Sequence, residues 1–440
     1  MEGRLEGIPP GASPSGPGAP PEKVPLRAVA WCYAGNVGFS AGLFFHAFLY
    51  NFYLDGLGLK AGVMGQAASL LTAGGLLAVL PAGWLVDRVG SRAALRAAIG
   101  IAVLGLAGGA FAESAASIGL TALVTGAATS TWRVASLPAL MSLADHSLGR
   151  ARLFGWNVAL LVGSGGLWYA LAGTLPRWLE PMVTSRHASI RWTLLAGSLL
   201  TGLALICYAA ARIPSPVRRP ASERLRASQI GCLGPLAIPR PAIAIAVAAA
   251  AWMIGSAMLS PFYNIYFHDR FGLAIDRLGL IFGLSHLATA AVVLASGEVA
   301  TRVGPIRTLA GWITAFPALT MLLAFVSVPG PALAVYFLLG LVSPSSNPLF
   351  DQLLFDRVPV DRRGLAASWR NGATETSGAL GAWLGGLVLE ASSYRVLFAM
   401  ATLSGVVGGA AVASTALLPA RREPEPPAEQ PPGTLSQDRG

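Results

Sequence analysis

Apolar runs of about 20 residues recur along the whole chain, and each is long enough to cross a lipid bilayer as an α-helix. Charged residues make up only 12% of the 440 residues, against about 25% in soluble domains. The chain is also rich in glycine and proline, which membrane helices tolerate. This pattern predicts an integral membrane protein of the all-α fold class.

Twelve transmembrane spans are predicted, six in each half of the chain. Their approximate ranges are 28–54, 61–86, 93–112, 116–143, 153–176, 192–211, 242–267, 278–300, 307–327, 332–355, 364–390 and 394–418. We expect a six-helix half at 27–211, a cytoplasmic linker at 212–241 and a second six-helix half at 242–420. Their compositions predict disordered tails at 1–26 and 421–440.

The two halves carry copies of one short charged turn. The copies pair Gly83 with Gly297, Arg88 with Arg302 and Gly90 with Gly304, each 214 residues apart. A second match pairs Asn51 with Asn264, each after a tyrosine, at an offset of 213 residues. Because each half has an even number of spans, the halves have the same orientation and form parallel repeats about an axis along the membrane normal.

Basic residues predict the orientation of the spans. With both termini in the cytoplasm, 23 of the 31 Lys and Arg residues fall in the tails, in the cytoplasmic loops or at the adjoining span ends, and Arg370 is counted there. Seven fall on the outside, several of them between 177 and 191, and Arg133 lies inside a span. The positive-inside rule therefore favours cytoplasmic termini. The net charge of +10 is a topology signal, and nucleic-acid binding is not expected.

The first charged turn resembles the signature of the loop between spans two and three in the major facilitator superfamily, Gly-x-x-x-Asp-Arg-x-Gly-Arg-Arg/Lys. The matching residues are Gly83, Asp87, Arg88, Gly90 and Arg92, while Ser91 replaces a basic residue. The second copy has Thr301 at the acidic position. The resemblance covers about 27–420 and implies two six-helix halves that rock around a midplane site. No subfamily is identified, since the antiporter motifs of spans four and five are incomplete.

The turn has a physical logic of its own. Gly90 allows the chain to reverse tightly, and Asp87 is expected near the start of the third span, where the helix dipole favours negative charge. Arg88 is expected to pair with Asp145 at the end of span four. The resemblance implies that this cluster latches the cytoplasmic side when the transporter faces outward. The alternative is an anchor at the lipid headgroups.

Charges inside the spans are candidates for substrate or proton binding, because they are costly in a bilayer. Arg133 lies deep in span four, and an unpaired arginine there would be unfavourable. We therefore predict a counter-charge from the other half, with Glu375 in span eleven as first choice and Asp351 in span ten as second. A purely structural ion pair is the alternative interpretation.

Four further polar residues lie toward the outer ends of their spans. His46 and His286 could relay protons or simply pack through hydrogen bonds. Asn51 and Asn264 could line the mouth of a cavity or belong to an interfacial anchor with their neighbouring tyrosines.

These features predict a secondary active transporter of a small, hydrophobic or amphipathic organic molecule, working by alternating access as a proton-coupled exporter in the plasma membrane. The alternatives are an importer of a small metabolite and a transporter-like sensor or scaffold. A membrane-embedded enzyme is disfavoured, since no catalytic constellation or nucleotide-binding loop stands out. We expect a monomer whose partners are the substrate and the lipid bilayer, and no metal or cofactor.

Overall fold

The computed structural model describes residues 26–143, 147–213, 240–359 and 362–416, and all regular structure in these ranges is helical. The first half contains α1 (Leu26–Gly56), α2 (Ala61–Val89), α3 (Ser91–Gly109), α4 (Ala115–Met141), α5 (Ser147–Leu179), η1 (Glu180–Met182) and α6 (Arg186–Ala210). The second half contains α8 (Arg240–Leu259), η2 (Ser260–Phe262), α9 (Tyr263–Phe271), α10 (Ile275–Val303), α11 (Pro305–Phe325), α12 (Pro329–Arg357), α13 (Arg363–Ala391) and α14 (Tyr394–Ala416). Most of both predicted tails, most of the linker and Asp145 lie outside the described residues.

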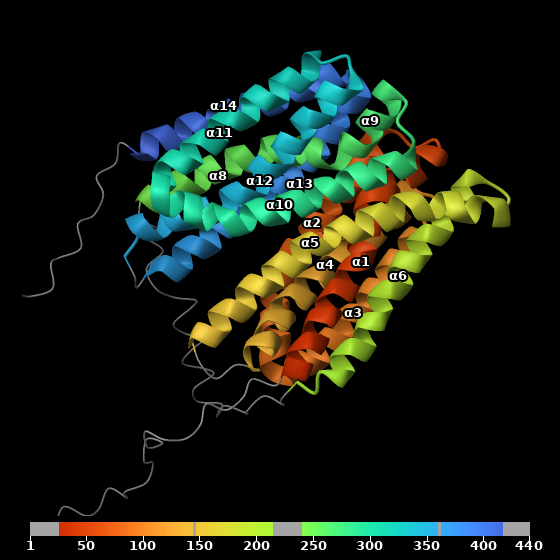
Figure 1. The fold of residues 1–440 in the computed structure, drawn as a ribbon, viewed down its shortest axis with the longest axis horizontal. Helices are drawn as coiled ribbons and strands as arrows, with labels where there is room; N and C mark the ends of the chain where they lie inside the picture. Colours follow the sequence, from red (N-terminus) through yellow and green to blue (C-terminus); the bar gives the residue numbers. More distant parts are fainter. Residues whose placement is uncertain (1–25, 144–146, 214–239, 360–361, 417–440) are drawn as a thin grey trace, which may run out of the picture.

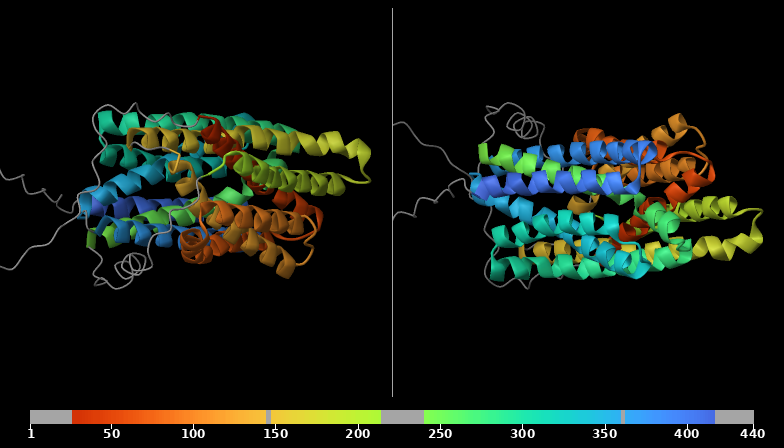
Figure 2. Two further views of the ribbon diagram at one scale, coloured as in Figure 1. Left: turned by 90° about the horizontal axis from the view of Figure 1, so that it is seen from below. Right: turned by 90° about the horizontal axis from the view of Figure 1, so that it is seen from above.

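The helices form two bundles that lie side by side, α1–α6 in one and α8–α14 in the other (Figure 1). We call the side where α1 begins and α14 ends the terminal side, and the opposite side the distal side. The long helices of both bundles run between the terminal and the distal side, and the α5–α6 connection projects beyond the others on the distal side (Figure 2). In Figure 1 the two bundles converge toward the distal side and diverge toward the terminal side.

The twelve predicted spans are present, with ends displaced by up to six residues. The largest shifts are at the starts of α5 and α6, so Arg186 and Arg191 belong to α6 and not to a loop. The seventh span is broken: α8 ends at Leu259 and α9 begins at Tyr263, with Pro261 in the short 3₁₀ turn between them. Proline lacks the backbone N–H and clashes with the preceding turn, which explains the break.

Within the described part of the chain, nine helices are long and apolar enough to cross a membrane. The broken pair α8–α9 counts as one of them, and α12 reaches the required hydropathy only over the shorter stretch Pro329–Val342. Helices α4 and α13 are not among the nine. These two helices carry Arg133 and Glu375, respectively.

Four glycines in the described ranges have a positive φ, and they form two pairs at the 214-residue offset. Gly58 and Gly272 follow the first span of each half, whereas Gly90 (φ 85°) and Gly304 (φ 95°) separate its second and third spans. The backbone of Gly90, with ψ 157°, lies in a region that is essentially restricted to glycine. The sequence repeat is therefore also a repeat of backbone conformation.

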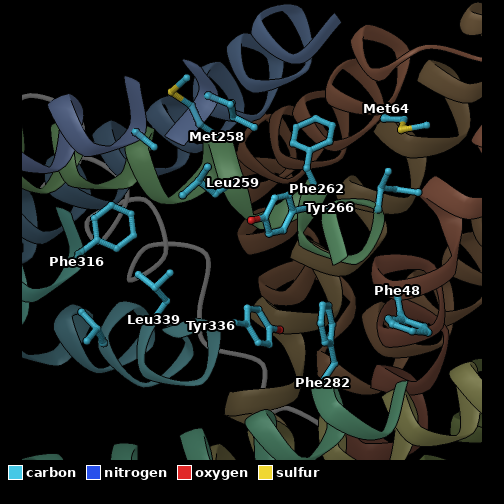
Figure 3. Close-up of a cluster of buried hydrophobic side chains, with 14 of the residues drawn as sticks. Phe48, Met64, Met258, Leu259, Phe262, Tyr266, Phe282, Phe316, Tyr336 and Leu339 are labelled. Atoms are coloured by element: carbon cyan, nitrogen blue, oxygen red, sulfur yellow. The ribbon is translucent and has the colours of Figure 1, made fainter. Parts of the chain in front are cut away.

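One hydrophobic cluster joins the two bundles near the distal side. Phe48 of α1 contacts Phe282 of α10 with ring centroids 5.6 Å apart, and Phe282 stacks on Tyr336 of α12 at 4.6 Å. Figure 3 shows these three rings in a row. Phe48 is fully buried, so the contact between the two halves is closed to solvent at this point.

Candidate functional site

A cavity of about 920 Å³ lies between the two bundles, with walls from both of them. The first half contributes mainly α1, α2 and α4, and the second half mainly α8 and α13. Most of the wall consists of small or apolar side chains such as Ala67, Leu71 and Met253, interspersed with hydroxyl groups such as that of Thr125. A cavity of this size and character fits a drug-sized molecule.

Arg133 and Glu375 meet across this cavity. Arg133 Nη1, on α4, lies 3.7 Å from Glu375 Oε1, on α13, so the pair joins the two halves. The side chains are 59% and 40% exposed, respectively, and both line the cavity. The structure thus brings together the two residues that sequence reasoning placed first. Both side chains are partly exposed to the cavity, so the pair is not enclosed by protein on all sides.

Asp351, the second predicted partner of Arg133, pairs instead with Arg370 one helix away. Arg370 Nη2 donates to Asp351 Oδ1 at 2.8 Å and to Asn371 Oδ1 at 2.7 Å. Arg370 lines the cavity with only 5% of its surface exposed. Arg370 lies on the second turn of α13, the span end to which the charge count assigned it, but its side chain is buried at the cavity and not in a loop. The signal that could have revealed it was its position inside the predicted span 364–390, five residues before Glu375.

His46 lies on the cavity wall, where its ring packs against Tyr50 at a centroid distance of 5.1 Å. Neither ring nitrogen of His46 has a hydrogen-bond partner, nor does the Tyr50 hydroxyl, and all three atoms are buried. His286 does not line the cavity. Its ring lies against Phe44 and Tyr169 of the other half, at 5.7 and 4.6 Å. Together with Phe48, Phe282 and Tyr336, these rings form a set of contacts on the distal side that we call the aromatic seal.

Asn51 and Asn264 form a reciprocal clamp between the halves. Asn51 donates through Nδ2 to the carbonyl oxygen of Pro261, and Asn264 donates to the carbonyl oxygen of Phe48 at 2.6 Å. Phe48 and Pro261 are themselves 213 residues apart, like the two asparagines. Asn51 also borders the cavity, whereas Asn264 is 2% exposed and does not. In this conformation, therefore, only Asn51 of the two asparagines borders the cavity.

On the distal side of the cavity, helices from the two halves cross at two glycine–glycine contacts, which we call the glycine crossings. A Cβ built on Gly65 of α2 would lie 2.8 Å from Gly386 Cα of α13, and one built on Gly173 of α5 would lie 2.7 Å from Gly279 Cα of α10. Gly65 matches Gly279 at an offset of 214, and Gly173 matches Gly386 at 213. The two crossings are thus related by the repeat, and backbones approach this closely only where side chains are absent.

An ion pair caps each crossing on the distal side. Arg177 Nη1 lies 2.8 Å from Asp276 Oδ2, and Lys60 Nζ lies 3.7 Å from Glu390 Oε1. Glu390 also accepts a hydrogen bond from the backbone N–H of Gly62 at 3.1 Å. These pairs, the crossings, the clamp and the aromatic seal all lie toward the distal ends of their helices, so the cavity is closed on that side.

The charged turn on the terminal side differs from expectation in one detail. Helix α2 continues to Val89, so Asp87 lies in its last turn, and the first turn of α3 contains no acidic residue. The Arg88 guanidinium lies 4.2 Å from the centre of the Trp84 ring. Arg92 Nη2 donates to the carbonyl oxygen of Ile213 at 2.7 Å, which ties the turn to the end of α6.

The structure places the other residues of the two charged turns on their helices and does not test the latch. Gly83 lies within α2 in open space, Gly297 lies within α10, and Arg302 is in the last turn of α10. The partner expected for Arg88, Asp145, is outside the described residues. The latch remains a prediction.

Comparison with known proteins identifies the family. The sequence profile of the Major Facilitator Superfamily matches residues 30–310 and 243–437. This chain therefore belongs to the major facilitator superfamily, and it is a membrane transporter, not an enzyme. A comparison with curated protein sequences gives no match.

Solved structures share the fold at low sequence identity. A mutant of the nucleoside transporter NupG is 13% identical, with a TM-score of 0.71, and the alignment covers 89% of this chain and 100% of that one. A bacterial homologue of the human lysosomal transporter Spinster, in an inward-facing and occupied conformation, is 11% identical with a TM-score of 0.70. That alignment covers 89% of this chain and 96% of the homologue. At these identities the likeness concerns the fold alone.

Proposed function

We propose that this protein is a secondary active transporter that moves a small amphipathic molecule by alternating access. The observation that carries the proposal is the cavity between the two halves, whose walls come from both halves and which is closed on the distal side. Rocking of the halves about the glycine crossings would open the distal side and close the terminal side. The repeat-related contacts suit such a motion, because both interfaces have the same construction.

The cavity wall supports an amphipathic substrate. Its charges form two neutral pairs, Arg133 with Glu375 and Arg370 with Asp351, of which only Asp351 does not line the cavity. The remaining surface is mainly apolar and favours a molecule with an apolar body and few polar groups. The nucleoside named for NupG is a property of that protein, and the mainly apolar wall here favours a less polar substrate.

For orientation, we propose cytoplasmic termini and a plasma-membrane location. Two basic residues that count against this orientation, Arg177 and Arg191, are neutralised on the distal side by Asp276 and by Glu113, respectively. The orientation rests on the charge distribution. With this orientation, the cavity, which is closed on the distal side, opens toward the cytoplasm. A cysteine at Ser327, exposed in the distal turn between α11 and α12, should then react with impermeant reagents only from outside the cell.

For coupling, we propose proton-driven export. Glu375 is the carboxylate and His46 the imidazole among the residues described on the cavity wall, and protonation of Glu375 would weaken its attraction to Arg133 between the halves. Such a change at an inter-half contact would link proton binding to rocking.

The test is transport in proteoliposomes loaded with three fluorescent amphiphiles: anionic pyrenebutyrate, neutral Nile red and cationic ethidium. We expect flux of at least one of them to depend on a pH gradient and to lose that dependence in Glu375→Gln. The matched control is Glu180→Gln, at an exposed acid in the distal turn η1. Flux no greater than in protein-free liposomes for all three would refute transport and favour the sensor or scaffold.

A further inference from the structure

Arg370 has hydrogen-bonding capacity that the protein does not use. Its guanidinium group offers five N–H donors in a fixed plane, and its hydrogen bonds to Asp351 and Asn371 are both made by Nη2. Nε and Nη1, with the other three hydrogens, are buried and have no partner. Unpaired donors on a buried cation are unfavourable, so the site is incomplete as it stands.

The missing partner is a negatively charged hydrogen-bond acceptor. Each carboxylate of the two cavity pairs already has an arginine within 4 Å, Glu375 at 3.7 Å and Asp351 at 2.8 Å. The unsatisfied groups are thus donors, on a guanidinium whose planar fork matches carboxylate or sulfonate oxygens. A cationic ligand would find no unpaired carboxylate here.

The position of Arg370 suits the polar end of a longer molecule. It lies on the second turn of α13, at the terminal end of the cavity-lining series Arg370, Asn371, Thr374, Glu375, Gly378 and Ala382. Beyond Glu375 this series becomes small and apolar, and it faces Met253 from α8 and Thr72 from α2, both in contact range of Gly378. A headgroup at Arg370 would therefore leave an apolar body along the distal part of the cavity.

We propose that Arg370 binds the anionic headgroup, a carboxylate or sulfonate, of an amphipathic substrate. The proposal rests on the transport function proposed above and names the class of its substrate. Because Nε and Nη1 are covered, binding requires the guanidinium to turn toward the cavity and to exchange Asp351 for the ligand. Asp351 is 39% exposed and stays hydrated after the exchange, whereas Arg370, at 6% exposure of its side chain, depends on an ionic partner.

Equilibrium binding to the purified full-length protein in phosphatidylcholine nanodiscs tests the proposal. The probes share an eight-carbon chain and differ in the headgroup: octanoate, octanesulfonate, octanol and octyltrimethylammonium. We expect the two anions to bind more tightly than the alcohol and the cation. Arg370→Gln should lower octanoate affinity by about 10-fold or more, the loss typical of a bond to a charged group. Arg96→Gln, at an exposed position of α3, is the matched control and should bind as the wild type does.

Two further variants separate a binding role from a structural one. Asp351→Asn removes the competing carboxylate and should raise octanoate affinity by about 10-fold, an effect that a purely structural arginine would not produce. The double variant Asp351→Asn with Arg370→Gln leaves no unpaired charge, so it should fold and still bind octanoate weakly. Wild-type affinity in the double variant, no gain in Asp351→Asn, or preferred binding of octyltrimethylammonium would each overturn the proposal.

Two sources of the anionic amphiphile remain to be separated by the same assay. Nanodiscs that also contain phosphatidylglycerol should abolish the octanoate signal if a lipid headgroup occupies the site, and should preserve it if the ligand is a soluble amphiphile.

The proposed anion site and the proposed transport function can be refuted independently of each other. Octanoate binding without flux of any dye refutes the proposed transport alone, whereas pH-driven dye flux without anion binding refutes the Arg370 site alone.

Discussion

Addition of a single methyl group at a glycine crossing should open the distal side of the transporter. In Gly279→Ala, the new Cβ would lie 2.6 Å from the carbonyl oxygen of Tyr169 and 2.6 Å from the Cα atom of Gly173. Because both are backbone atoms, no change of side-chain rotamer relieves the overlap. Helices α5 and α10 must separate, and that separation is available in a conformation whose distal side is open.

The size of the effect follows from the cost of overpacking. An extra methyl group in a well-packed contact costs about 1–3 kcal/mol, which shifts a two-state equilibrium by about 5- to 150-fold. The equivalent change at the other crossing, Gly65→Ala, places its Cβ 2.6 Å from the carbonyl oxygen of Ala382 and 2.8 Å from Gly386 Cα. The crossings share no residue, so the combined variant should shift the equilibrium by about 2–6 kcal/mol.

Distances between two spin labels measure this shift. In a cysteine-free background, labels at Thr184 and Ser392, which are exposed on the distal side of the two halves, should move apart in Gly279→Ala and further in the combined variant. Gly100→Ala is the control, because a Cβ on Gly100 of α3 meets nothing within 4 Å. It should stabilise its helix by up to about 1 kcal/mol without changing the distances. Unchanged distances in the folded combined variant would refute the assignment of the crossings as the distal closure.

The distal ion pair of Arg177 and Asp276 should have a weak effect on the same equilibrium. Arg177→Asp should lengthen the spin-label distances, and its combination with Asp276→Arg should restore them. The coupling energy of the pair should be about 0.2–1 kcal/mol and should decline with salt. Equal distances in the single and exchanged variants would contradict this role. A double-mutant cycle of Arg133→Ala and Glu375→Gln should give a coupling to thermal stability of no more than about 1 kcal/mol, since both side chains are substantially exposed. A coupling of several kcal/mol would contradict a half-solvated pair. Gly90→Val should lower thermal stability by about 1–3 kcal/mol because its backbone conformation is restricted to glycine, and transport at the wild-type rate in this variant would leave the turn without a role in rocking.

Properties that depend on a few neighbouring residues could be predicted from the sequence. Helix positions follow from hydropathy over about 20 residues, and the reversal at Gly90 follows from the freedom of glycine at one position. The repeat was visible as an offset, so the match between Gly90 and Gly304 could be predicted and is present in the backbone. The meeting of Arg133 and Glu375 could be proposed as well, because few charges lie deep in the spans.

Contacts between distant helices were decided by the tertiary structure. The sequence alone did not indicate that Asp351 would take Arg370 as its partner, because both lie in the second half and the choice depends on how α12 packs beside α13. The crossing of Gly173 with Gly279 likewise looks, along the chain, like any other small residue in a membrane helix. Hydropathy determines which segments enter the bilayer, but it is nearly equal on all sides of such helices. Close packing and the pairing of buried polar groups therefore determine which faces meet, and both depend on residues far apart in the sequence.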